Sequence, residues 1–326
     1  MAGNNFINDI RTKSKEKNLP VAFPDAEDVR SIEAAKILKD NGIAKPVLVG
    51  NKEKITALAV ESKLEIEGVD IIDPENSEWA DDFAHILFEK RKHKGMTIEK
   101  AKETIKDPLY FAGLMLETDK ISAAVGGNIS STGNVLRAAI HTVGVAEGIS
   151  IVSSFFIMVF PEKMYCFADC AVNPDPDSNQ LADIAISSAK NYRAITGEDP
   201  KVAMLSFSTK GSAEHPAVDK VQQATKIVTQ KAPDIPTDGE LQLDAAILLS
   251  VGERKAPGSN VAGKANVLVF PDLNSGNIGY KLTQRLAGAE AVGPIVQGLK
   301  KPYCDLSRGC STDDMVNVAA ICTLMA

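Results

Sequence analysis

Ten residues near the C-terminus combine several chemically active side chains. The segment Asp305–Asp314, DLSRGCSTDD, holds an alcohol, a guanidinium, a thiol and carboxylates just before an apolar helical pattern. A helix start offers free backbone N–H groups and a partial positive charge, and Arg308 adds a planar fork for two phosphate oxygens. The segment therefore predicts a site for a phosphorylated or acyl-phosphate group. Ordinary capping, with Ser311 as the N-cap and Asp313 and Asp314 in the first turn, explains it equally well.

A second candidate is the strongest basic run of the chain. Lys90–Lys94, KRKHK, stands at the expected end of a helix. Cations are favoured there by the helix dipole, so a solvated helix end explains the run as well as contact with a polyanion does. In an acidic chain, so short a cluster suits a small phosphorylated ligand better than DNA.

Other patterns point away from nucleotide and metal sites. Gly258–Ala265, GSNVAGKA, nearly matches a P-loop, but Ala265 replaces the hydroxyl that holds Mg²⁺ and a strand follows instead of a helix. No G-x-G-x-x-G follows the first expected strand, and the four histidines are scattered. Cys166 and Cys170 have no second pair or histidine nearby, so we expect no metal site.

The elements that would position these residues alternate between short apolar runs and helical stretches. In the first half, strands are expected at 21–25, 46–50, 69–72 and 121–125, with helices at 29–41, 55–64, 79–91, 97–105 and 109–117. This alternation predicts a parallel sheet covered on both faces.

The pattern changes near residue 150. Two apolar runs, 151–159 and 164–167, flank Pro161-Glu162-Lys163 and predict a hairpin. Beyond it we expect strands at 202–207 and 265–271, and helices at 180–195, 217–231, 278–286 and 312–325. A domain boundary is therefore placed near residue 148.

Length and composition narrow the class of protein. With 326 residues the chain fits about two domains, and 44% hydrophobic with 24% charged residues is ordinary for a globular protein. The longest apolar run, 151–160, is too short to span a bilayer, and the N-terminus lacks the apolar segment of a secretory signal. We therefore expect a cytoplasmic protein with reduced cysteines. Its net charge of −7 argues against a nucleic-acid partner, and we expect no membrane partner.

Several long stretches carry a resemblance that spans essentially the whole chain. They are ADCAVNPDPDSNQLADIAI from Ala168, KVAMLSFSTKGSA from Lys201, DGELQLDAA from Asp238, KAPGSNVAGKANVLVFPDLNSGNIGYKLTQRLAGAEAVGPIVQGLKKP from Lys255, and DLSRG from Asp305. The chain thus resembles the phosphate acetyltransferases (phosphotransacetylases). The resemblance implies reversible acetyl transfer, in which acetyl-CoA and orthophosphate give acetyl phosphate and CoA.

The resemblance also implies an architecture. We expect an α/β fold of two α/β domains with a cleft between them, similar to the isocitrate/isopropylmalate dehydrogenase-like fold, with the site in that cleft. Domain 1 would comprise residues 1–148 plus 300–326 and carry the C-terminal segment. Domain 2 would comprise 149–299 and serve dimerisation. The family implies a homodimer that uses CoA or acetyl-CoA as substrate and needs no metal or other cofactor.

Site residues are carried over position by position. Ser307 and Arg308 match the family's active-site pair, and Asp314 matches the carboxylate proposed as the base for the CoA thiol. Phosphate binding is implied for Arg308 together with two pairs of residues, namely Ser131 and Thr132 in a small-hydroxyl loop, and Tyr280 and Lys281 in a glycine-rich loop after the strand at 266–270. CoA binding is implied for Arg91, Arg137 and Arg285.

Three places depart from the family pattern. Ser130 stands where a histidine is common, and Ala138 replaces a proline that often follows the loop arginine. Tyr303-Cys304 replaces a Val-Asn pair frequent in bacterial relatives. These changes bear on the fine geometry of the phosphate loop and on acyl preference, and they leave the Ser-Arg-Asp constellation intact.

Moving the thiol proton poses the main chemical problem. A free thiol has a pKa near ~8.5 and a free aspartate one near ~3.9, so proton transfer is uphill by about 6 kcal/mol in water. Burial raises the pKa of a carboxyl group and nearby cations lower that of a thiol. We therefore expect Asp314 to face a drier pocket, away from Arg308.

Alternatives stay open at this level. A phosphate butyryltransferase would share the chemistry with a larger acyl pocket, and a non-catalytic acetyl-CoA-sensing module would lack turnover. A decarboxylating dehydrogenase on the similar fold would need a metal-binding aspartate cluster that the sequence does not show. Cys310 could carry the acyl group in a ping-pong reaction, but the resemblance favours direct transfer in a ternary complex.

Overall fold

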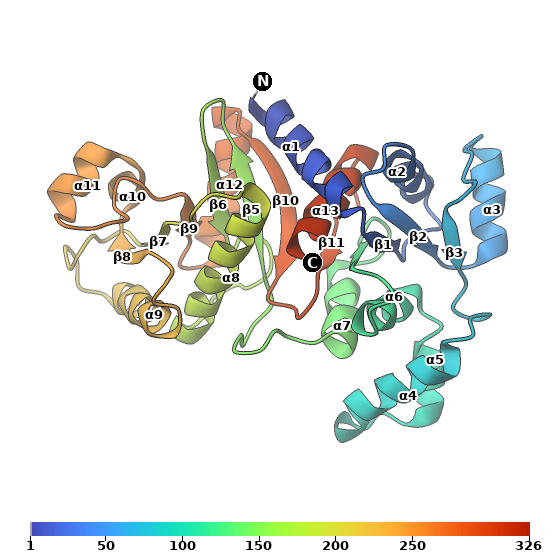
Figure 1. Cartoon of the computed structure of the whole chain (residues 1–326). Coiled ribbons are helices and arrows are strands. Elements are labelled where there is room, and N and C mark those ends of the chain that lie inside the picture. Colours follow the sequence, from blue (N-terminus) through green and yellow to red (C-terminus); the bar gives the residue numbers. More distant parts are fainter. Residues whose placement is uncertain (1) are drawn as a thin grey trace. The chain divides into compact units, whose positions relative to one another are not determined.

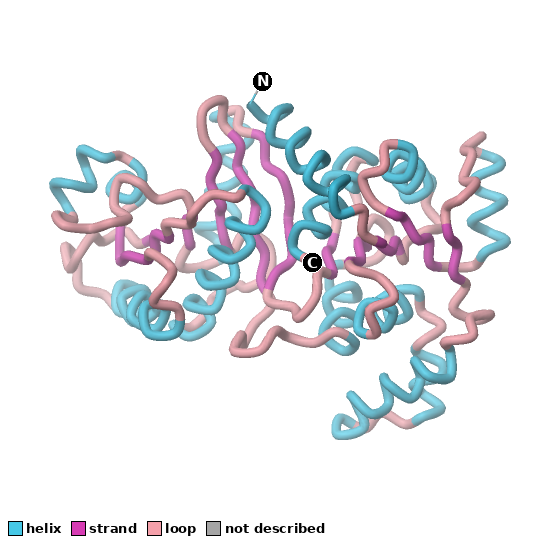
Figure 2. Tube along the Cα trace, in the orientation of Figure 1, coloured by secondary structure: helices cyan, strands magenta, loops and turns pink. Residues whose placement is uncertain are grey.

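The computed structural model describes residues 2–326, and these divide into two compact α/β units, as their ribbons show (Figure 1). Unit 1 comprises residues 2–6 and 146–298, and unit 2 comprises Ile7–Val145 and Leu299–Ala326. Unit 2 holds a five-stranded sheet and unit 1 a six-stranded sheet, drawn in magenta in Figure 2. The predicted α/β class is confirmed.

Unit 2 is built on a parallel sheet, as the alternating pattern predicted. The strand order is β11 (Tyr303–Asp305), β4 (Ala123–Gly126), β1 (Pro20–Phe23), β2 (Lys45–Val49) and β3 (Asp70–Ile72), and every neighbouring pair runs parallel. The sequence did not predict β11, because Tyr303 and Cys304 stand between Pro302 and Asp305 and form no longer apolar run.

Helices cover both faces of this sheet (Figure 1). One face carries α2 (Val29–Asp40) and α13 (Thr312–Met325), against which pack α3 (Lys52–Glu61) and α1 (Ala2–Lys17). The other face carries α6 (Pro108–Glu117) and α7 (Thr132–Thr142), against which pack α4 (Ala80–Arg91) and, through α4, α5 (Ile98–Thr104). The short η1 (Lys92–Lys94) follows α4. Neither α1 nor α7 was predicted.

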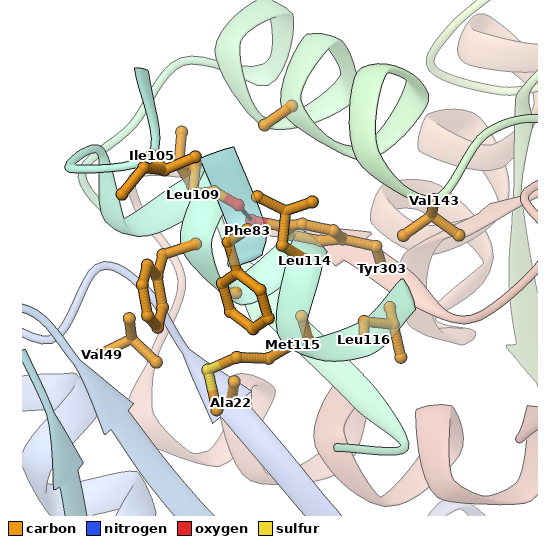
Figure 3. Packing of buried hydrophobic residues seen from close by; sticks show 14 of the residues in the cluster. Ala22, Val49, Phe83, Ile105, Leu109, Leu114, Met115, Leu116, Val143 and Tyr303 are labelled. Atoms are coloured by element: carbon orange, nitrogen blue, oxygen red, sulfur yellow. Dashed lines mark hydrogen bonds between the residues drawn. The ribbon is translucent and has the colours of Figure 1, made fainter. Parts of the chain in front are cut away.

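The core beneath α4, α6 and α7 holds one of the departures from the family pattern. Phe83 and Phe111 pack with ring centroids 4.9 Å apart, and Tyr303 lies fully buried in the same cluster (Figure 3). The Tyr303 hydroxyl donates a hydrogen bond to the Leu109 carbonyl at 3.0 Å. Its neighbour Cys304 is also buried. Tyr303 of β11 therefore joins the sheet to α6 through buried packing and one hydrogen bond.

Unit 1 contains the predicted hairpin. The strand order is β10 (Glu290–Gln297), β5 (Ser153–Val159), β6 (Met164–Ala168), β9 (Val267–Val269), β7 (Val202–Leu205) and β8 (Thr237–Leu241). β5 pairs antiparallel with β6 and with β10, whereas the remaining pairs run parallel. Helices α8 (Ser178–Thr196) and α9 (Pro216–Lys231) pack on one face, and α10 (Leu243–Ile247), α11 (Leu249–Lys255) and α12 (Leu273–Ala287) complete the unit.

The near-P-loop is a packed connection into a strand, as its context predicted. It runs from the end of α11 into β9. Gly263 has φ +76°, and a Cβ there would stand 2.6 Å from the Leu249 Cα, while its N–H donates to the Ala245 carbonyl at 2.8 Å. Glycine is needed for this close approach, and the backbone N–H is already used.

A Tyr303→Phe substitution should lower the free energy of unfolding by about 1 kcal/mol, because it deletes one buried hydrogen bond while leaving the apolar packing. Urea denaturation measures this directly. Tyr165→Phe is the matched control, since the Tyr165 hydroxyl has no hydrogen-bond partner among the described residues. Equal losses for the two variants would contradict a specific role for the Tyr303 hydroxyl.

Candidate functional site

Three neighbouring strands of unit 2 end at the same edge of the sheet. β1 leads to Asp25, β4 to the loop 127–131, and β11 to the loop 306–311. Ligands of open parallel α/β sheets bind outside these carboxyl ends. The topology therefore brings the Ser131-Thr132 and Ser307-Arg308 pairs, far apart in the sequence, to one edge of unit 2.

Asp25 organises the loop 127–131. Its Oδ2 accepts hydrogen bonds from the N–H groups of Gly127, Ile129 and Ser130 at 2.8, 3.1 and 3.0 Å. Its Oδ1 accepts one from the Ser130 hydroxyl at 2.6 Å. Ser130, which stands where the family commonly has a histidine, is thus tied to Asp25 and holds the loop in place.

The two loops meet at backbone distance beside Gly127. The Leu306 N–H donates to the Gly126 carbonyl at 2.7 Å. Gly127 has φ +97°, and a Cβ there would lie 2.2 Å from Asp305 Oδ1 and 2.6 Å from the Leu306 nitrogen. Only glycine fits, so the loop after β4 is pressed against the segment that carries Ser307 and Arg308.

The side chains at this edge are open to a ligand. Ser131 caps α7 by accepting the Asn134 N–H, and Ser131 and Thr132 are exposed at the start of that helix. Arg308 is exposed, and its guanidinium has no partner among the described residues. The Ser307 hydroxyl is also exposed and accepts the Gly309 N–H at 3.2 Å. A helix N-terminus, hydroxyls and a free fork favour an oxyanion.

Asp314 does not lie where it was expected. It is exposed, and its Oδ2 accepts hydrogen bonds at 2.9 Å from both the backbone N–H and the hydroxyl of Ser311. Together with the Ser311 hydroxyl on the Asp314 N–H, these bonds form a capping box at the start of α13. The expectation of a dry pocket is wrong, whereas the N-cap role predicted for Ser311 is confirmed.

Two of the predicted CoA arginines approach the same pair of side chains in unit 2. Tyr110 bonds to His141 Nδ1 at 3.0 Å. Burial lowers the pKa of His141, and the positive charges of Arg91 and Arg137 lower it further. Within the basic run, Lys90 pairs with Glu117 and Lys92 with Glu89. Arg91 has no such partner among the described residues, so this arginine pair is available to a ligand.

The remaining predicted residues lie on α12 of unit 1. The resemblance put Tyr280 and Lys281 in a glycine-rich loop, whereas the apolar spacing predicted a helix at 278–286. The segment is helical and includes Arg285, so the predicted helix is confirmed. A Cβ on Gly276 would stand 2.1 Å from the Asp169 carbonyl oxygen, so the glycine lets α12 approach the sheet closely. Tyr280 stacks on Phe156 with centroids 4.2 Å apart, which fixes its ring.

Comparisons with known proteins match this chain over nearly its whole length. The family model described as "Phosphate acetyl/butaryl transferase" matches residues 5–323. A phosphate acetyltransferase of Acetivibrio thermocellus is 49% identical over 98% of both chains. The chain belongs to the phosphate acetyl/butaryl transferase family.

Solved structures agree with this assignment. A phosphotransacetylase from Streptococcus pyogenes superposes with a TM-score of 0.95 at 41% identity, covering 99% of this chain and 98% of that one. A putative 4-hydroxythreonine-4-phosphate dehydrogenase from Salmonella typhimurium covers 95% of this chain and 99% of its own at a TM-score of 0.58 and 11% identity, a likeness of fold alone. The dehydrogenase-like α/β fold is thus confirmed.

The family's sequence pattern did not reveal every residue that shapes this edge. Asp25 and Arg30 make more hydrogen bonds to the two loops than any residue carried over from the family, yet neither belongs to a motif quoted for the resemblance. One sequence signal could have indicated Asp25, because it is a polar residue close after a buried strand. No sequence signal indicated Arg30, because three of its hydrogen-bond partners lie on segments distant in the sequence.

Among the described residues, no cluster of histidine, cysteine and carboxylate side chains could hold a metal ion. In the same part of the chain no helix is long and apolar enough to cross a membrane. Cys310 is buried, and burial raises the pKa of its thiol despite the charge of Arg30. The thiol is therefore protonated near neutral pH, which disfavours it as a nucleophile.

Asp305 is a buried acid directly beneath the loops. Among the described residues its Oδ1 has no hydrogen-bond partner. Burial raises the pKa of its carboxyl group to about 6, although a hydrogen bond from Thr132 to the carboxyl group opposes the increase. Asp25 adds to the increase through charge repulsion. Because the native state binds this proton more tightly than the unfolded chain, its contribution to stability is lost as pH rises from about 4 to about 6.

An Asp305→Asn variant should lack this loss. Relative to the wild type, its free energy of unfolding should improve between pH 4.5 and pH 7.5 by up to about 3 kcal/mol, since one pKa unit corresponds to about 1.4 kcal/mol. Urea denaturation at several pH values measures the difference. Replacing the exposed Asp82 by Asn should leave the pH profile unchanged, and a pH-independent difference for Asp305→Asn would refute the assignment.

Proposed function

We propose that the chain catalyses reversible acetyl transfer between CoA and orthophosphate, so that acetyl-CoA and phosphate give acetyl phosphate and CoA. The observation that carries this proposal is the meeting of the Ser307-Arg308 loop with the start of α7, in a chain 49% identical to a phosphate acetyltransferase. The enzyme is an acyltransferase of its family and requires no cofactor besides the CoA substrate.

Phosphate, or the phosphoryl group of acetyl phosphate, lies at the edge of unit 2. Arg308 holds two of its oxygens with its fork, and the hydroxyls of Ser131 and Thr132 with the N-terminus of α7 receive the others. The Arg308 guanidinium has no acceptor among the described residues, whereas Thr132 also hydrogen-bonds Asp305.

CoA binds through its own phosphates. Arg91 and Arg137, which both lie near the Tyr110–His141 pair, supply the cationic surface. The geometry supports a small phosphorylated ligand for the basic run, because two of its lysines are already paired within the fold.

Acetyl transfer then occurs directly in a ternary complex. The CoA sulfur attacks the acetyl carbonyl, Ser307 donates to the developing oxyanion, and phosphate leaves onto Arg308. Asp314 takes the thiol proton on Oδ1, which has no partner among the described residues, while Oδ2 stays bound to Ser311. Juxtaposing two substrates supplies a large share of the rate.

The enzyme acts as a cytoplasmic homodimer without a nucleic-acid or membrane partner. Its α12 supports dimerisation, because Ile278, Leu282 and Leu286 are spaced four residues apart and are 56%, 51% and 80% exposed. Such spacing places the three side chains on one face of the helix.

The reaction is tested by phosphate-dependent release of CoA thiol from acetyl-CoA, followed with a thiol reagent. The proposal expects turnover that requires phosphate and is slower with butyryl-CoA. Faster turnover of butyryl-CoA would make the chain a phosphate butyryltransferase, and no phosphate-dependent release with either would leave only acetyl-CoA sensing.

Arg308→Ala should lower turnover on the order of 10²-fold or more, because it removes the donor pair for the departing phosphate. Arg308→Lys should recover only part of this loss, since an ammonium cannot form the fork. Steady-state kinetics with saturating CoA measures both. Full activity of the lysine variant would show that charge alone matters.

Cys310→Ala should retain most activity, because the buried neutral thiol has no role in direct transfer. Labelled phosphate should also fail to exchange into acetyl phosphate when CoA is absent. Near-total loss of turnover in the variant, combined with CoA-independent exchange by the wild type, would instead identify Cys310 as an acyl carrier in a ping-pong mechanism.

Arg91→Ala and Arg137→Ala should each raise the KM for CoA more than that for acetyl phosphate, because they remove cations that contact only CoA. Repeating the titration with dephospho-CoA shows whether the contact is to the 3′-phosphate. An equal rise for both substrates would place these arginines outside the CoA site.

A further inference from the structure

Arg30, in the first turn of α2, is held by a neighbouring carboxylate. Its Nε donates to both oxygens of Asp28 at 3.1 and 3.2 Å, and its Nη2 lies 2.5 Å from Asp28 Oδ2. Burial opposes ionisation of Asp28, but hydrogen bonds from Arg30 and Asn128 outweigh it and lower the pKa of the carboxyl group. The guanidinium is therefore fixed in direction by an ionised partner.

The other donors of Arg30 reach backbone carbonyls on both loops. Nη1 donates to the carbonyls of Arg308 and Cys310 at 3.0 and 2.8 Å. Nη2 donates to the Asn128 carbonyl at 3.0 Å. One planar group thus joins the segment after β1, the loop after β4 and the loop after β11, and all of these contacts lie within unit 2.

These contacts bear on the two groups that bind phosphate. The Arg308 carbonyl belongs to the residue whose free guanidinium projects from the loop, and Asn128 lies three residues before the N-cap Ser131. Fixing both carbonyls on one rigid fork sets the spacing between the Arg308 backbone and the start of α7. A lysine cannot do this, since its single ammonium lacks a planar set of donors.

We propose that Arg30 is a positioning residue for phosphate, which holds the loops 127–131 and 306–311 at the separation that lets both contact one phosphoryl group. This inference rests on the function proposed above. Arg30 itself touches no substrate, because its donors are used within the fold.

Arg30→Lys should therefore act on phosphate more than on CoA. We expect kcat/KM for phosphate to fall about 10- to 100-fold, as small misplacements of reacting groups do, while the KM for CoA changes by less than about 3-fold. The control is Arg193→Ala, which removes an arginine paired with an exposed aspartate in unit 1. Its kinetics should match the wild type.

A double-mutant cycle tests whether Arg30 acts through Arg308. In an Arg308→Ala background, Arg30→Lys should cost about 3-fold or less, because the group that it positions is gone. A full 10- to 100-fold loss in that background, or equal losses for phosphate and CoA, would overturn the inference.

Hydrogen exchange provides a readout that does not depend on activity. In Arg30→Lys, amide exchange should accelerate at least about 10-fold in peptides covering 126–132 and 306–311, and remain unchanged in peptides covering 153–168 and in Arg193→Ala. Unchanged exchange in both loops would overturn the inference even if the wild type were an active acetyltransferase. Accelerated exchange in the variant, together with an inactive wild type, would instead refute the proposed function. It would still show that the hydrogen bonds of Arg30 hold the two loops in place.

Discussion

The geometry of unit 2 depends on one buried carboxylate. The Asp25 carboxylate accepts hydrogen bonds from three backbone N–H groups and one hydroxyl of the loop after β4. These bonds compensate for the water that the buried carboxylate has lost, and they hold the loop at residues 127, 129 and 130. Without those bonds the charge would be costly at this depth, and the loop would lose its template. Gly127 then presses the loop onto Asp305 and Leu306, so the phosphate loop and the Ser-Arg loop share one support.

Carboxyl groups and guanidinium groups occupy different depths in unit 2. Beneath the loops lie the carboxyl groups of Asp25, Asp107 and Asp305, and burial raises the pKa of the last two while Asp25 repels both. Arg308 and Arg137 are exposed in the same unit, and Arg91 is half-buried there. In a chain with a net charge of −7 such local cations suit a small phosphorylated ligand better than a nucleic acid.

The sequence predicted those elements whose formation depends on interactions between residues close together in the chain. Helices such as α2 and α13 and the hairpin of unit 1 were predictable, because periodicity and caps such as Ser311 act locally. α7 was missed because its start, Ser131 to Asn134, is rich in poor helix formers and packing decides its conformation. β11 was missed because Pro302 and Asp305 flank its two apolar residues and interrupt the apolar run.

The same distinction applies to the residues of the candidate site. Family motifs pointed to Ser307, Arg308 and the hydroxyls of residues 131 and 132, and the strand order brings these to one edge of the sheet. The motifs gave no sign of Asp25 or Arg30, whose contacts form only when three strand ends converge. The environment of Asp314 was predicted wrongly, because the chemistry of a base was weighed without the capping box that binds its Oδ2. The resemblance put Tyr280 and Lys281 in a loop, whereas the apolar spacing at 278–286 correctly predicted a helix, and Gly276 and Gly279 serve the close packing of α12.

The position of bound phosphate tests the central claim most directly. A crystal structure of the full chain grown with inorganic phosphate should show the ion held by the Arg308 guanidinium and by the hydroxyls or amides at the start of α7. The Arg30 bonds to the Asn128 and Arg308 carbonyls should be retained. Phosphate ordered only elsewhere, for example on the basic run Lys90–Lys94, with Arg308 left empty, would contradict the account.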